Sequence, residues 1–393
     1  MSKTERLFSR EFILINLIFF AASITTAIFF QFHRYLDFLK IHEEWSGFII
    51  AADAIPAIVL QPILGALLNN KTTKKCMLTG ILIMVIAMLS YRLASTVPTL
   101  VAVRILQGTG FACLVSAMMV LVVSYIPLNK SGMAFGVIST VRLIPYAFVP
   151  PIMGMYFAAP QDFIKAVIYC IIPMMLSLLL AATVETPHIM DNRTSQYPSI
   201  KINVIIKNFK NLSVTAVLLL NLLLYSGYTT VFFFFEGFSR KSGNTNPGMF
   251  FAVATAMMFA VRVFGSKLFD SINKAYLTFF CMLGLTICYA ALPFSSSYSV
   301  FYILAFFTGL AWGTVMPVAY ALMFEVSDPQ LRGLNLNLSL VMMQGGFFIG
   351  PFLGGIVHGW WGYGMLFYFC AFISLLSAML ARIVIYHTNK AFL

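Results

Sequence analysis

The sequence has few charged residues for its length. Only 10% of the 393 residues are Asp, Glu, Lys or Arg, whereas 60% are hydrophobic. An average soluble domain is about 45–50% apolar and about 25% charged. So few charges could not cover an apolar core of this size in water, which excludes a water-surrounded enzyme. A lipid bilayer is the remaining solvent, and the length allows about a dozen spans of roughly 20 residues each.

Signatures of catalysis and of metal binding are also missing. The six cysteines show no CxxC spacing and lie in or beside apolar segments, where we interpret them as small buried hydrophobes. The sequence has no phosphate-binding loop, dinucleotide fingerprint, metal-spaced His/Cys cluster or nucleophile elbow. We therefore expect no enzyme, no cofactor and no metal site. Energy would have to come from an ion gradient or from the gradient of a solute.

Apolar runs between polar segments predict twelve spans. Their residue ranges are 12–32, 46–68, 77–95, 98–125, 133–158 and 163–184, then 212–235, 247–269, 275–293, 299–323, 334–357 and 363–386. We predict an N-terminal six-helix bundle over 1–184, a cytoplasmic linker over 185–211 and a C-terminal six-helix bundle over 212–393. Because the number of spans is even, both termini lie on the same side.

The net charge of +12 follows the expected topology. With the N-terminus in the cytoplasm, 16 of the 25 Lys and Arg residues fall on the cytoplasmic side, six on the opposite side and three within spans. An excess of Lys and Arg in cytoplasmic loops is the usual orientation signal of membrane proteins. The sequence thus predicts a multi-pass protein of the cell (inner or plasma) membrane, with both termini cytoplasmic and no nucleic-acid partner.

The two halves repeat at an offset of about 200 residues. The matching pairs are 150–154 with 350–354, Gly108 with Gly309, and Asn69 with Asp270. Six spans per half give both halves the same orientation, which is the parallel repeat of two-bundle transporters. The predicted fold is therefore an all-α integral membrane protein, with the solute bound near mid-membrane between bundles that alternate access by rocking.

Three motifs carry a resemblance to a known family. Residues 65–75 are similar to the loop signature Gly-x-Leu-x-Asp-x-x-Gly-Arg-Arg/Lys of the major facilitator superfamily, with Asn69 in place of Asp. Residues 104–110 (Arg-Ile-Leu-Gln-Gly-Thr-Gly) resemble the family's Arg-x-x-Gln-Gly-x-Gly motif, and residues 262–270 resemble a second copy of the loop signature. The exporter motif Gly-Pro-x-x-Gly-Gly is degraded at 149–154 and cleaner at 350–355. The resemblance implies the major facilitator fold and leaves the substrate open.

The resemblance also implies a gating role for several residues. In this family the loop carboxylate faces the N-terminus of a helix in the other bundle and latches the cytoplasmic side. Asp270 keeps this charge whereas Asn69 does not, so we expect the contact made by Asp270 to contribute more to closing the cytoplasmic side than the contact made by Asn69. Arg262 starts the second loop signature. Gly350 and Pro351 would allow a close, bent helix contact, although generic helix packing explains them as well.

Ionisable residues inside spans are functional candidates, because burying them in a bilayer is expensive. The spans hold Arg104, Arg142 and Arg262 against one clearly embedded acid, Asp53. Asp53 and Arg104 lie at a matched depth, which predicts an ion pair between the second and fourth spans. Proton coupling through Asp53 and Arg104 and a purely structural pair are both open.

Arg142 lies roughly 15 Å into the fifth span, at 1.5 Å per residue, and thus near mid-membrane. Its guanidinium either contacts the substrate, donates hydrogen bonds to carbonyl groups, or reaches toward the membrane surface by snorkelling. An unpaired guanidinium favours an anionic ligand, which it grips through two parallel hydrogen bonds. Further polar side chains could line the same solute site or simply join helices: Asn221, Tyr225 and Tyr228 on one face of the seventh span, Trp312 in the tenth and Gln344 in the eleventh.

These features predict a secondary active transporter. We favour a proton-coupled exporter, an antiporter, of a small organic solute, and among solutes an organic anion such as a carboxylate or a metal-chelating metabolite. The alternatives are an importer or facilitator of an organic anion and a non-transporting membrane sensor. The expected partners are the solute, protons and the lipid bilayer, and we expect a monomer.

Overall fold

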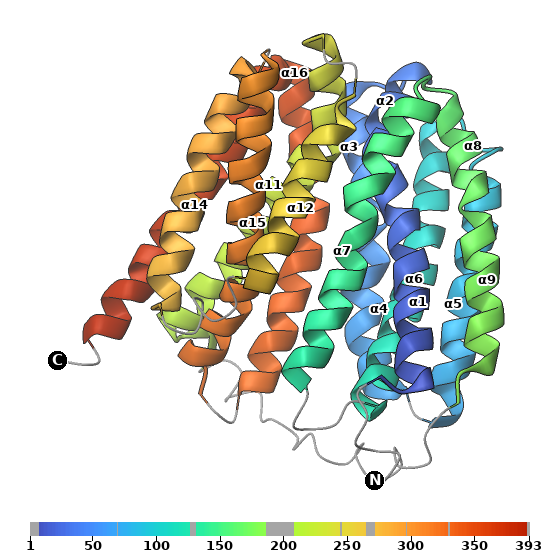
Figure 1. Cartoon of the computed structure of the whole chain (residues 1–393), viewed down its shortest axis with the longest axis horizontal. Coiled ribbons are helices and arrows are strands. Elements are labelled where there is room, and N and C mark those ends of the chain that lie inside the picture. Colours follow the sequence, from blue (N-terminus) through green and yellow to red (C-terminus); the bar gives the residue numbers. More distant parts are fainter. Residues whose placement is uncertain are drawn as a thin grey trace. The chain divides into compact units, whose positions relative to one another are not determined.

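The computed structural model describes residues 8–68, 70–125, 131–185, 208–243, 246–264, 272–295, 297–328 and 331–390. Asn69, Asp270 and most of the predicted linker lie outside these residues. Every regular element in the described ranges is a helix (Figure 1). The prediction of an all-α membrane fold is confirmed.

The chain divides into two compact units. The first comprises residues 1–41 and 52–198, and the second comprises residues 42–51 and 199–393. The second predicted span is therefore not one continuous helix. It consists of α3 (Glu43–Ala51), which belongs to the second unit, and α4 (Ala54–Leu67), which belongs to the first. A turn at Ala52 and Asp53 separates the two helices.

The first unit is built from long apolar helices. They are α1 (Arg10–Ala27), η2 (Ile28–Gln31), α2 (Phe32–Phe38), α4, α5 (Asn70–Ser90), α6 (Val97–Tyr125), α7 (Ser131–Tyr156), α8 (Asp162–Tyr169) and α9 (Ile171–Thr183). The first predicted span thus continues to Phe38, and the sixth is interrupted at Cys170. The hydroxyl of Ser9 accepts a hydrogen bond from the Phe12 N–H and caps the start of α1.

The second unit is also built from long apolar helices. Its helices are α3, α11 (Leu212–Lys241), α12 (Gly248–Phe264), α14 (Lys274–Ala291), η5 (Leu292–Phe294), α15 (Tyr298–Val326) and α16 (Arg332–Lys390). The last two predicted spans lie in α16, which consists of two helices that meet at a kink at Gly362, with φ 76° and ψ −176°. An L side chain rarely adopts this positive φ, so glycine allows the chain to turn between the two parts.

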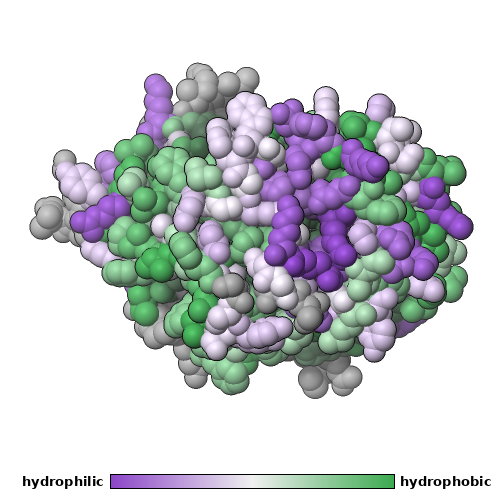
Figure 2. All heavy atoms as spheres, turned by 90° about the horizontal axis from the view of Figure 1, so that it is seen from above, coloured by the Kyte–Doolittle hydropathy of each residue, from purple (hydrophilic) through white to green (hydrophobic). Residues whose placement is uncertain are grey.

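Nine helices of the described residues are long and apolar enough to cross a membrane, and one of them, Leu334–His387, has 54 residues. The total of twelve spans stays a prediction. Large apolar side chains stand exposed along the helices, as at Ile172, Leu179 and Ile287. Figure 2 looks onto one end of the helices and shows hydrophilic residues gathered in one part of that end, with hydrophobic residues over much of the remaining surface. Exposed apolar side chains of this kind fit a lipid surround.

Glycines bring α11 and α16 together in the second unit. Gly346, Gly350 and Gly354 recur every four residues along α16, and a Cβ added at Gly350 would lie 2.5 Å from Thr229 Oγ1. The Thr229 hydroxyl also donates a hydrogen bond to the Gly346 carbonyl at 3.3 Å. Small residues at this spacing let helix backbones approach closely in a membrane.

The same part of α16 also receives α3. A Cβ added at Gly47 would meet the Pro351 carbonyl and would lie 2.8 Å from Gly355 Cα. Gly350 and Pro351 are therefore packing residues inside the second unit, and their gating role stays a prediction.

We expect Gly350→Ala to destabilise the protein by about 1–3 kcal/mol, because the new methyl group overfills a closed contact. Gly284→Ala in α14 is the matched control, since a Cβ there meets nothing within 4 Å and alanine favours a helix by about 1 kcal/mol. Thermal unfolding of the two purified variants in detergent measures the difference. Equal melting temperatures would show that the α11–α16 contact is not tight.

Candidate functional site

A buried ion pair occupies the first unit at the break in the second span. Arg104 Nη2 lies 2.7 Å from Asp53 Oδ1, with the Arg104 side chain 1% exposed and the Asp53 side chain 33% exposed. This confirms the ion pair predicted between the second and fourth spans. Asp53 stands in the turn between α3 and α4, and Arg104 reaches it from α6.

Several neighbours hold the Arg104 guanidinium in place. Its Nη1 donates to Gln107 Oε1 at 3.2 Å, and the Tyr91 hydroxyl donates to the same oxygen at 2.7 Å. The guanidinium also lies over the Phe29 ring at 4.6 Å and the Phe32 ring at 5.3 Å. Hydrogen bonds and aromatic faces both stabilise a desolvated cation. Arg104 is therefore fixed, and Asp53 is the more accessible end of the network.

The next turn of α6 presses on the backbone of the same break. A Cβ added at Gly108 would meet the Asp53 carbonyl oxygen and lie 2.8 Å from Asp53 Cα. Arg104 and Gly108 are four residues apart and share one helix face. Thus one turn of α6 binds the Asp53 carboxylate, and the following turn packs against the Asp53 backbone.

The second unit repeats this helix crossing without the charges. Gly309 on α15 follows Gly108 by 201 residues, and a Cβ added there would lie 2.6 Å from the Cα of Ala254 on α12. Ala254 follows Asp53 by 201 residues, and Ala305 follows Arg104 by 201. The crossing therefore forms with two alanines where the first unit has an ion pair. Helix packing alone does not require the Asp53–Arg104 pair.

Arg142 lies half-buried on α7 in the first unit. Its guanidinium carbon is 5.6 Å from the centre of the Phe19 ring on α1. One turn later, the Tyr146 hydroxyl donates to Thr26 Oγ1 at 3.2 Å. No carboxylate or carbonyl of the described residues accepts a hydrogen bond from Arg142.

Arg262 lies near the described end of α12 in the second unit. Its side chain is close enough to Tyr225 and Tyr228 of α11 to interact with both electrostatically. Its Nε is buried and has no hydrogen-bond partner among the described residues. The sequence analysis assigned Arg262 to a gating motif, whereas the structure brings it to two of the predicted substrate residues.

The other predicted substrate residues are mostly interior. Asn221 is fully buried, and its Nδ2 donates to the Val217 carbonyl at 3.1 Å. Trp312 is also buried, and its indole N–H donates to the Tyr289 hydroxyl at 2.8 Å. Gln344 is 5% exposed. Asn221 and Trp312 thus stabilise the interior of the second unit here, and a role in solute binding stays a prediction for all three.

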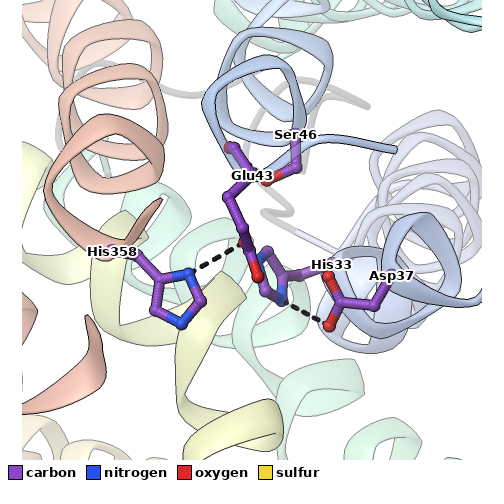
Figure 3. A network of polar contacts seen from close by, with 5 residues as sticks. All are labelled: His33, Asp37, Glu43, Ser46 and His358. Carbon is purple, nitrogen blue, oxygen red and sulfur yellow. Dashed lines mark hydrogen bonds and ion pairs between the residues drawn. The ribbon is translucent and has the colours of Figure 1, made fainter. Parts of the chain in front are cut away.

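The structure adds ionic contacts that hydropathy had not singled out. Glu236 on α11 is 1% exposed and pairs with Arg240 at 2.5 Å, so it is a second buried carboxylate. Between α3 and α16, the Glu43 carboxylate lies 2.8 Å from His358 Nδ1 (Figure 3), and Trp360 donates to Glu44 at 2.7 Å. Figure 3 also shows His33 pointing toward Asp37 within α2, at 3.5 Å.

Comparison with protein families decides the identity of this fold. The family model described as Major Facilitator Superfamily matches residues 12–297 and 274–391. The chain belongs to the Major Facilitator Superfamily. It is a membrane transporter of this superfamily, as the loop and fourth-span motifs predicted.

Curated relatives match over most of their length. Multidrug resistance protein MdtG of Proteus mirabilis is 25% identical over 363 residues, covering 85% of this chain and 84% of the relative. Multidrug resistance protein 2 of Bacillus subtilis is 22% identical over 336 residues, covering 82% of each chain.

Solved structures share the fold at low identity. A D-xylose–proton symporter superposes with a TM-score of 0.75 at 15% identity, covering 94% of this chain and 96% of the symporter. The human organic anion transporter TETRAN superposes with a TM-score of 0.67 at 12% identity, covering 97% of this chain and 100% of the transporter. At these identities the superpositions show the fold alone.

We expect the Asp53–Arg104 pair to behave as a coupled unit in stability. Asp53→Ala alone leaves a buried cation without its counter-ion and costs about 3–5 kcal/mol. Asp53→Ala combined with Arg104→Met removes both charges and recovers most of that loss, since the second unit folds with alanines at both positions. Thermal unfolding of both variants measures the coupling. If the double variant is no more stable than Asp53→Ala, the prediction is wrong and the pair is needed for the stability of the fold.

Proposed function

We propose that this transporter exports a small organic solute in exchange for protons, by alternating access. The observation that carries the proposal is the Asp53–Arg104 pair, which is present in only one of two otherwise matching helix crossings. Cell-membrane location and cytoplasmic termini follow from the bias of Lys and Arg between the predicted loops.

Asp53 is suited to carry the proton. Its side chain is 33% exposed and is the more accessible member of the pair, whereas Arg104 is 1% exposed and is held by Gln107 and two aromatic rings. Protonation would remove the Coulomb attraction between α6 and the break in the second span and leave the buried Arg104 charge without its counter-ion, which raises the free energy of this arrangement. A change of charge at a bistable element is how local protonation shifts a conformational equilibrium.

The sign of the unpaired charges favours an organic anion. Among the described residues, the carboxylates of Asp53 and Glu236 have arginine partners, whereas Arg142 and Arg262 have no acidic partner within 4 Å. A site for cations would need an available carboxylate in the membrane. An available guanidinium suits a carboxylate, whether of a simple metabolite or of a carboxylate-rich metal chelator.

Export is favoured by the relatives rather than by the geometry. Two similar proteins are named for multidrug resistance, and outward transport is the simplest route to resistance. Inward transport or facilitated diffusion of an organic anion is the runner-up, because the same fold serves a D-xylose–proton symporter. A non-transporting sensor is the third candidate and would show no solute flux in proteoliposomes.

Asp53→Asn should abolish proton-driven accumulation but retain solute–solute exchange, because the variant can bind and carry solute without moving a proton. The assay is uptake into inverted vesicles under an imposed proton gradient, followed by counterflow without a gradient. Asp162→Asn is the control, since Asp162 lies at the start of α8 and pairs with Lys165 outside the network. Proton-driven accumulation by Asp53→Asn at the wild-type level would refute this coupling role.

Arg142→Gln should weaken transport of organic anions, with an increase of about tenfold or more in KM, because one charge-assisted hydrogen bond contributes about 1.5–3 kcal/mol. Arg142→Lys should retain part of the affinity, since it keeps the charge but loses the two parallel hydrogen bonds. Kinetics on panels of anionic and cationic solutes measure both effects. Unchanged anion transport by Arg142→Gln would remove Arg142 from the solute site.

A further inference from the structure

We infer that Arg262, Tyr225 and Tyr228 form an anion-recognition site within the second unit and select the acidic group of the solute. The inference rests on the proposed transport of an organic anion. It gives a role in specificity to Arg262, which the motif resemblance assigns to gating. Its basis is the buried, unpartnered Nε of Arg262 on α12, together with packing contacts that join this part of α12 through α15 to Tyr228 of α11.

The three side chains are placed to act on one ligand. Tyr225 and Tyr228 are three residues apart on α11 and therefore lie on one helix face. Arg262 follows Met258 by one turn of α12, and a Cβ added at Gly313 of α15 would lie 2.7 Å from Met258 Cα. The neighbouring Trp312 ring lies 4.8 Å from the Tyr228 ring, so this part of α12 lies close to the tyrosine face of α11. The Arg262 charge is within electrostatic range of both phenols. A guanidinium offers five N–H donors and each phenol offers one O–H donor. A planar carboxylate accepts several such hydrogen bonds at once.

Arg262 is incompletely satisfied by its surroundings. Its Nε is buried and has no hydrogen-bond partner among the described residues. Leaving a buried donor unsatisfied is costly, and charged groups inside membrane proteins mark functional positions. An acidic ligand would supply the missing acceptor and the missing counter-charge together.

Aromatic packing holds the two tyrosines in place. The Tyr228 ring lies 4.8 Å from the Trp312 ring in an edge-to-face contact, and Trp312 is itself held by Tyr289. The Tyr225 ring lies 5.7 Å from Phe347. Rings fixed in this way present their hydroxyls without a further loss of conformational freedom on binding. Buried Trp312 therefore acts as a positioning residue for Tyr228.

The internal repeat shows that the fold does not need this arginine. Arg262 follows Gln61 by 201 residues, so the first half has a neutral amide at the matching position of α4. The competing explanation is gating, in which Arg262 serves Asp270 of the same loop signature. The two explanations predict different kinetics, because a recognition residue changes selectivity whereas a latch residue changes the rate of the conformational cycle.

The test compares Arg262→Gln, Arg262→Lys, Tyr228→Phe and Asp270→Asn in inverted vesicles. The probes are radiolabelled benzoate, malate and citrate, each alongside its methyl ester. Gel filtration and thermal unfolding establish that each variant is folded. The readouts are KM, maximal rate and the preference for each anion over its ester.

We expect Arg262→Gln to raise the KM for the transported anion by about 10–100-fold and to bring the anion-to-ester preference close to one. Arg262→Lys should keep part of the preference, and Tyr228→Phe should raise KM by several-fold. Asp270→Asn should lower the maximal rate and leave the preference unchanged.

Wild-type preference in Arg262→Gln, or the same kinetic change in Arg262→Gln and Asp270→Asn, would overturn the recognition site and leave anion transport standing. A wild-type protein that moves cations or esters in preference to all three anions would overturn both this site and the anionic substrate class.

Discussion

The structure depends on one constraint, which is that the Arg104 charge inside the membrane needs a counter-ion. Asp53 supplies it at 2.7 Å, and Gln107 together with two aromatic rings completes the surroundings of the guanidinium. This arrangement places a carboxylate in the turn that interrupts the second span. Gly108 brings the α6 backbone against the same turn. Ionic and steric contacts thus converge on a single point of the chain.

That point is also where the chain passes from one compact unit to the other. α4 belongs to the first unit, whereas α3 packs on α16 of the second through Gly47 and Gly355 and through the Glu43–His358 contact. Asp53 therefore stands next to the peptide segment that connects the two units. The second unit has Ala254 and Ala305 at the matching positions, so in the proposed mechanism only the first half carries the group that binds the proton.

Hydropathy and matched depth predicted the helical membrane fold and the Asp53–Arg104 pair, because both are properties of local sequence. The superfamily was indicated by the resemblance of three motifs to a known family. The break at Ala52 and Asp53 could not be predicted, since it depends on packing against distant helices. The proximity of Arg262 to Tyr225 and Tyr228 was missed because a motif match had given Arg262 a gating role. The spacing of Asn221 and Trp312 predicted shared faces but could not tell an interior face from a solute-facing one.

The most direct test of the account is the number of protons exchanged when solute binds to the purified protein. The measurement records the pH of a weakly buffered detergent solution on addition of the transported anion, for the wild type and for Asp53→Asn. The account predicts a shift of about one proton per wild-type molecule and none for Asp53→Asn at saturating solute. An equal shift in the two proteins would contradict it, because the proton would then be carried by a group other than Asp53.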